Sequence, residues 1–127
     1  MAAGDIMDAK RAQVIEVAAG GAVAVGDLVH IEADGYWDKT ASGDVGKFGV
    51  ALDEAAAEGD KIRVGVEGEF EVTASAAAIA KGDYVIADAG VVKNAGTIDA
   101  TTLAGSIVGY TRTAFVSGGT GTITLLG

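Results

Sequence analysis

The stretch KIRVGVEGEFEVT, residues 61–73, decides the fold. Its odd positions are polar or glycine, and its even positions are apolar or glycine: Ile62, Val64, Val66, Gly68, Phe70 and Val72. This alternation has the period of an extended strand and not of a helix. Burying each large side chain on the even face stabilises the fold by roughly 1.5–3 kcal/mol, as an upper bound, so a sheet or a partner must cover that face. Gly65 and Gly68 are expected to mark a bend or the close approach of another backbone.

Shorter strands are expected before this one, at residues 13–17 (QVIEV), 23–32 and 48–52 (FGVAL). Within 23–32, the pair Gly26-Asp27 predicts a turn or a bulge. The pair Asp34-Gly35 predicts a hairpin with a return strand through Tyr36, Trp37 and Lys39. The polar segment 53–60 is expected to be a loop that leads into the long strand.

The pattern restarts after the long strand. Residues 24–29 (AVGDLV) are echoed 56 residues later by residues 80–85 (AKGDYV), and the segments 48–51 and 60–64 have counterparts at 108–111 and 121–125. Two internal copies, at about 24–66 and 80–126, imply a duplicated strand–hairpin–strand unit. The sequence therefore predicts an all-β protein: one small β-barrel or β-sandwich domain over residues 13–127, after a flexible arm over residues 1–12.

The composition fits one small domain with tight turns. The chain has 127 residues, of which 50% are hydrophobic, 20 are glycine and none is proline or cysteine. Turns must then be made by Gly, Asp and Asn. No apolar run approaches the ~20 residues that cross a bilayer, and the N-terminus lacks the order of a signal peptide. A soluble protein that is not exported by that route is expected, with no membrane partner.

The net charge of −9 argues against a nucleic-acid partner, because phosphate binding needs clustered Lys and Arg. The charge is unevenly distributed. From residue 94 to residue 127 only Asp99 and Arg112 are charged. Because interface cores are depleted of charge, this nearly neutral quarter predicts a subunit contact, with Thr122 and Thr124 as candidate interface residues.

Every motif for chemistry fails at a defining position. His30 is the sole histidine and there is no cysteine, so a typical zinc site with three or four protein ligands is not expected. The pair Gly46-Lys47 lacks the rest of a phosphate loop, since Phe48 stands where Ser or Thr is needed. The glutamates of the long strand are interpreted as its solvated face. The sequence predicts a non-enzyme without metal, cofactor or small-molecule substrate.

Two features suggest surfaces for contact. Tyr36 and Trp37 are adjacent on a strand, so they point to opposite faces and one of them should face outward. Trp37 is therefore a contact candidate. The arm carries four more candidates: Ile6 and Met7, which a purely solvating tail would not need, and Lys10 and Arg11, the only adjacent basic pair in the chain.

The chain resembles the capsid cement, or head decoration, proteins of tailed bacteriophages, which are small Gly/Ala/Val-rich β proteins. The resemblance covers almost all of the chain from Gln13 onward, through residues 14–31, 48–52, 58–72, 78–90 and 120–126. Family members often have a proline in the segment matching AAGG, which this chain lacks. That departure affects only a loop.

The resemblance implies a virion structural protein, made in the host cytoplasm, that decorates and stabilises the outer capsid surface. It implies a homotrimer that ties neighbouring major capsid protein subunits together, with the arm and Trp37 as capsid-contact candidates. An acidic outer face would keep densely covered particles from sticking to one another.

Two alternatives stay open. The repeated V/A-x-G-D-x-V turn also occurs in hammerhead-type carrier domains that bear a lipoyl or biotinyl lysine, and Lys39 after a hairpin is similar to their modified residue. The flanking Glu-Thr is missing, and the spacing from Gly26-Asp27 is too short. A tail or fibre binding module would share the fold but not the capsid partner.

Overall fold

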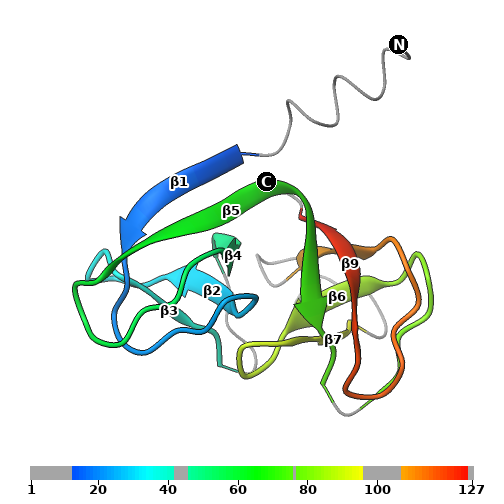
Figure 1. The fold of residues 1–127 in the computed structure, drawn as a ribbon. Coiled ribbons are helices and arrows are strands. Elements are labelled where there is room, and N and C mark those ends of the chain that lie inside the picture. The colour runs from blue at the N-terminus through cyan, green and yellow to red at the C-terminus, as the bar shows by residue number, and fades with distance from the viewer. Residues whose placement is uncertain (1–12, 42–45, 76, 96–106, 126–127) are drawn as a thin grey trace.

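The computed structural model describes residues 13–41, 46–75, 77–95 and 107–125, and these residues form strands and turns without a helix. None of the described residues thus lies in a helix long and apolar enough to cross a membrane. The strands are β1 (Gln13–Ala18), β2 (Leu28–Ile31), β3 (Trp37–Lys39), β4 (Phe48–Ala51), β5 (Lys61–Thr73), β6 (Tyr84–Ala87), β7 (Val92–Asn94), β8 (Ile107–Thr111) and β9 (Thr120–Leu125). They form one curled antiparallel sheet in the order β3-β2-β4-β5-β9-β8-β6-β7, with β1 added on β5 (Figure 1). The predicted all-β class is confirmed.

Strand β5 has the bounds that the alternation predicts, and it arches over both halves of the sheet (Figure 1). Its first part pairs with β1 on one edge and β4 on the other, so that Val64 faces both Ile15 and Ala51. Its last part pairs with β9. The backbone reaches a φ of 110° at Gly68, where the two parts meet. A side chain on Gly65 would overlap the ring of Phe70. Gly68 thus marks the expected bend, while the close neighbour at Gly65 is a side chain of the same strand and not another backbone.

The two halves of the sheet have the same connectivity. The chain runs β2, β3, β4 and the start of β5 in the first half, and β6, β7, β8 and β9 in the second. In each half the turn before the hairpin is held by an equivalent hydrogen bond. The Gly26 amide donates to the Ala51 carbonyl (2.8 Å), and the Gly82 amide donates to the Thr111 carbonyl (3.0 Å). That a sequence duplication over residues 24–66 and 80–126 produced this arrangement stays a prediction.

The equivalence extends to segments upstream of the predicted copies. The end of β1 is joined to β3 by a parallel bridge between Ala19 and Trp37, and the end of β5 is joined to β7 by a parallel bridge between Ala74 and Val92. β1 pairs with β5 as the last part of β5 pairs with β9. β5 is therefore the last strand of the first half and the first strand of the second.

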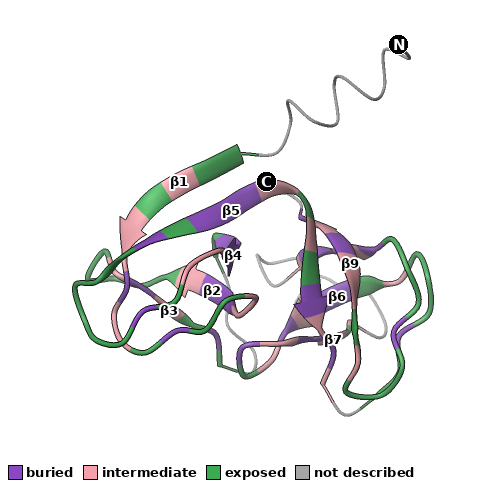
Figure 2. Ribbon diagram, viewed as in Figure 1, coloured by how far each residue is buried: buried purple, intermediate pink, exposed green. Residues whose placement is uncertain are grey.

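Two buried clusters fill the halves, and the second draws on both. The first cluster lies within the first half and contains Trp37, Ile62 and Val64. The second contains residues of β5 to β9, and also three side chains from the outer face of the first half: Leu28, Phe48 and Val50. These three are 0%, 6% and 2% exposed, because residues of the second half cover them. Figure 2 shows buried residues in both halves of the sheet.

Asp53 ties the loop after β4 to β5. Its carboxylate accepts hydrogen bonds from the backbone amide (2.8 Å), Nε (2.9 Å) and Nη2 (2.9 Å) of Arg63. The side-chain hydrogen bond from Arg63, followed by the backbone one, lowers the pKa of Asp53 from its ordinary 3.8 to about 2. The predicted loop at 53–60 is thus held by a charge-assisted contact.

An Asp53→Asn variant is expected to be less stable than the wild type at neutral pH, with a difference that shrinks in acid. A carboxylate whose folded pKa is depressed stabilises the fold above its unfolded pKa, and this contribution is lost as the pH falls through 3.8 toward 2. The effect should be small, because the Arg63 side chain is 61% exposed and solvent screens the pair. Thermal unfolding across this pH range measures it, with the neighbouring Glu54→Gln as control. A difference that does not change with pH would contradict the assignment.

Candidate interaction surfaces

The outward side of the second half carries one row of paired side chains across four strands. Tyr84 on β6 lies opposite Tyr110 on β8, which lies opposite Thr124 on β9, which lies opposite Glu69 on β5. Tyr84 is 48% exposed, Tyr110 and Thr124 are half-buried, and Glu69 is exposed. We call Tyr84, Tyr110 and Thr124 the tyrosine face. Tyrosine combines an apolar ring with a polar tip and is enriched in protein interfaces.

Charged groups border this face. The Arg112 guanidinium pairs with the Glu69 carboxylate at 3.1 Å. The Thr124 hydroxyl, and then the Arg112 guanidinium, lower the pKa of Tyr110. Thr122 lies on the same side of β9, opposite Glu71. The structure thus brings the predicted interface residues Thr122 and Thr124 together, but sets them among β5 glutamates. The surface is less neutral than the sequence of the last quarter predicts.

The β2–β3 hairpin forms as expected, but it presents a different aromatic residue. Gly35 has a φ of 86°, and the Tyr36 amide donates to the Asp34 carboxylate at 3.0 Å. Trp37 is only 5% exposed, because its side chain lies in the first buried cluster, whereas Tyr36 is half-buried. Trp37 is therefore a core residue, which corrects its assignment as a contact candidate.

The tip of this hairpin, residues 31–36, places the apolar Ile31 beside the acidic residues Glu32 and Asp34. Ile31 is 44% exposed. A hydrogen bond with Asp38 is the main cause that raises the pKa of Glu32. We call residues 31–36 the hairpin tip.

The predicted arm contacts Ile6, Met7, Lys10 and Arg11 lie outside the described residues. The structure does describe the strand that follows them. β1 is paired along one edge with β5, and Val14 near its start is 46% exposed.

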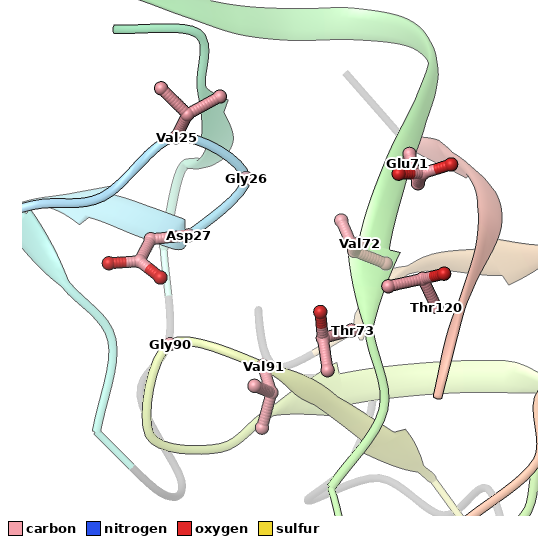
Figure 3. Close-up of a pocket in the computed structure, with 9 residues that line it drawn as sticks. All are labelled: Val25, Gly26, Asp27, Glu71, Val72, Thr73, Gly90, Val91 and Thr120. Carbon is pink, nitrogen blue, oxygen red and sulfur yellow. The ribbon is translucent and has the colours of Figure 1, made fainter. Parts of the chain in front are cut away.

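A cavity of about 250 Å³ lies at the seam between the halves (Figure 3). It is lined by the turn at 25–27, the end of β5 (71–73), Gly90, Val91 and Thr120. Its acidic Asp27 is already used, since the carboxylate accepts the Ala24 amide at 2.9 Å and holds the turn. Within the described ranges, no group of three or more His, Asp or Glu side chains is placed to hold a metal ion.

The sequence also singled out His30 and Lys39, and both pack against neighbouring residues of the fold. His30 is half-buried on β2 and stacks with Phe48, with 6.3 Å between ring centroids. Lys39 lies within β3, and its aliphatic stem lies where a side chain on Gly90 would point.

Sequence reasoning missed the tyrosine face. Its signal lay in the two echoed segments, in which Leu28 of the first is replaced by Tyr84 of the second. That replacement marks a position that is buried in one half and open in the other.

The chain belongs to the phage cement protein family, whose match covers residues 6–126. Among solved structures, its fold is similar to the N base of the head fibre protein gp8.5 of bacteriophage phi29, with a TM-score of 0.62 and 17% sequence identity. The similarity covers 89% of this chain and 94% of that chain. Comparison with curated proteins gave no match.

Proposed function

We propose that this protein is a virion structural protein that decorates the outer surface of a tailed-phage capsid and stabilises it by bridging neighbouring major capsid subunits. The observation that carries the proposal is the family match over residues 6–126. The head-fibre neighbour supports only the fold, because its sequence identity is 17%. The capsid-bound form is a homotrimer in this proposal, as the family resemblance implies.

The proposed stabilisation has a simple physical basis: the protein binds the assembled capsid shell and not its separate subunits. A protein that binds an assembled shell but not its separate subunits stabilises the shell by an amount set by its affinity and free concentration. Such a protein needs surfaces and no catalytic centre. The exposed strand faces and net charge of −9 suit that role, because like-charged covered particles repel one another.

Binding to purified capsids that lack decoration tests the function. The protein is expected to co-sediment with expanded capsids and to raise the temperature at which they rupture. A protein that neither binds such capsids nor changes their rupture temperature would contradict the proposal.

Deleting residues 2–12 is expected to weaken capsid binding at least tenfold, or ~1.4 kcal/mol, while the melting temperature changes by only a few degrees. We propose that Ile6 or Met7 fits a pocket on a neighbour, with the extended arm pairing along a sheet edge. Ordering the arm costs ~1–2 kcal/mol per residue, so the contacts must offset that cost. A matched control replaces residues 2–12 with a Gly/Ser segment of equal length. Unchanged affinity of the deletion would assign capsid contact to the folded domain.

Thr122→Glu and Thr124→Glu are expected to weaken trimer formation, because each adds a charge to the proposed subunit contact beside Glu69 and Glu71. Sedimentation velocity measures the change, with circular dichroism to show that the variants fold. Val116→Glu, which is 73% exposed and lies outside β9, is the control. If both variants fold and sediment as the wild type does, β9 is not at the interface.

A further inference from the structure

The two halves are equivalent in connectivity but differ in which faces are covered, and that difference indicates a partner. Leu28 begins β2 and Tyr84 begins β6, in equivalent places opposite Val50 and Tyr110. Leu28 is 0% exposed because the second half covers it, whereas Tyr84 is 48% exposed. The tyrosine face is thus the surface that the next unit would cover if the internal arrangement were repeated once more.

The complementary surface is open at the other end of the molecule. Ile31 ends β2 opposite Trp37, and Ala87 ends β6 opposite Val92, again in equivalent places. Ala87 is 0% exposed and lies in the cluster that receives the outer face of the first half, whereas Ile31 is 44% exposed. Each side of the internal contact therefore has an uncovered counterpart.

We propose that a second copy of this chain docks its hairpin tip, with Ile31, onto the tyrosine face of the first. The contact repeats between chains the contact that joins the two halves within one chain. It rests on the proposed function in one respect, because the decorating form proposed there is a homotrimer. It adds which two surfaces meet.

The internal contact shows how the docked surfaces would bind. Within one chain the Leu28 amide donates to the Gly90 carbonyl at 2.9 Å, and the Phe70 ring lies over Gly65. The equivalent pair between copies is the Tyr84 amide of one and the Gly35 carbonyl of the other. Ile15 of the docked copy takes the place of Phe70, since each of them pairs across its sheet with a buried strand residue, Val64 or Ile123.

Such a contact is heterologous, since two different surfaces meet. Heterologous contacts generate a closed ring when a whole number of equal rotations from one copy to the next makes a full turn. In such a ring neither of the two surfaces stays uncovered. Closure with three copies is the arrangement that agrees with the proposed homotrimer.

The test is sedimentation of the full chain with one surface blocked at a time. Tyr84→Glu blocks the tyrosine face and Ile31→Glu blocks the hairpin tip, and each is expected to weaken self-association at least about thirtyfold and to sediment as a monomer. An equimolar mixture of the two variants is expected to form a species of two chains, because one intact pair of surfaces remains. Val116→Glu, which is 73% exposed and on neither surface, should sediment as the wild type does.

The mixture distinguishes this arrangement from a symmetric contact between identical surfaces, for which mixing two blocked variants restores nothing. Circular dichroism and melting temperature show whether the variants fold, and Tyr84→Ser and Ile31→Ser take their place if a charge prevents folding. Folded variants that sediment as the wild type, a mixture without a two-chain species, or a monomeric wild type would each overturn the inference. If any of these holds while the wild type still binds capsids, only this inference fails. Association without capsid binding would contradict only the proposed function.

Discussion

Replacing Gly109 with alanine is expected to destabilise the protein by roughly 3 kcal/mol, the upper end of the usual cost of overpacking. Gly109 lies in β8, where it pairs with Val85 and Leu125. A methyl group there would overlap the backbone carbonyl of Thr124. Because the obstacle is backbone and not a flexible side chain, relief requires β8 and β9 to move apart. Urea unfolding monitored by circular dichroism measures the loss.

Gly21→Ala is the matched control, because its new methyl group would lie 3.6 Å from the nearest atom, the Asp38 carboxylate, in ordinary contact. It is expected to change the free energy of unfolding by less than about 0.5 kcal/mol. If Gly109→Ala also falls within that range, the sheet tolerates a wider β8–β9 spacing than the structure has.

Leu28→Ala is expected to cost about 2–5 kcal/mol, because it empties a fully buried site. Leu28 belongs to the first half but packs in the second cluster, so its loss should weaken both halves together. Trp37, the sole tryptophan, reports on the first cluster by fluorescence, while circular dichroism reports on the whole sheet. Both transitions are expected to shift to lower urea concentration and to stay coincident.

Val25→Ala is the control for Leu28, since Val25 is 65% exposed in the turn just before β2. Its effect is expected to lie within about 0.5 kcal/mol. A tryptophan transition that stays in place while the circular dichroism transition moves would show that the halves unfold separately.

Features set by local sequence were predicted well. The alternation in residues 61–73 gave the bounds of β5. Successive side chains of a strand point to opposite faces, so odd and even positions along the sequence are enough to assign each residue to a face. Asp34-Gly35 gave the hairpin, because the turn needs a positive φ that glycine adopts at little cost. The echo of Gly49 by Gly109 also has a physical reason. At each position the carbonyl of the neighbouring strand comes close to where a side chain would begin.

Features set by long-range pairing were not predicted. That β1 would add to β5 depends on which strand edges remain free, and residues 13–17 do not contain that information. Because adjacent strand residues point to opposite faces, the sequence predicted that one of Tyr36 and Trp37 faces outward, but not which one. The choice depends on the interior of the first half, where Trp37 fills the space beside Val64 and Ile62.

The candidate surfaces were predicted only in part. Thr122 and Thr124 do lie together on an outward face, as alternation along β9 requires. Their charged neighbours come from β5, which is about 50 residues away in sequence, so composition along the chain could not show them. The arm residues stay a prediction.

The continuity of β5 has a mechanical consequence. No linker separates the two halves, because one strand leaves the first ladder at Gly68 and enters the second. A change in the distance between the halves would require broken ladder hydrogen bonds, whereas a flexible tether would let that distance fluctuate. The halves also pack directly against each other through Leu28, Phe48 and Val50, so the shared strand and the shared cluster together fix their separation. In the function proposed above, this fixed spacing would let both halves meet a shell of regularly repeating subunits without stretching.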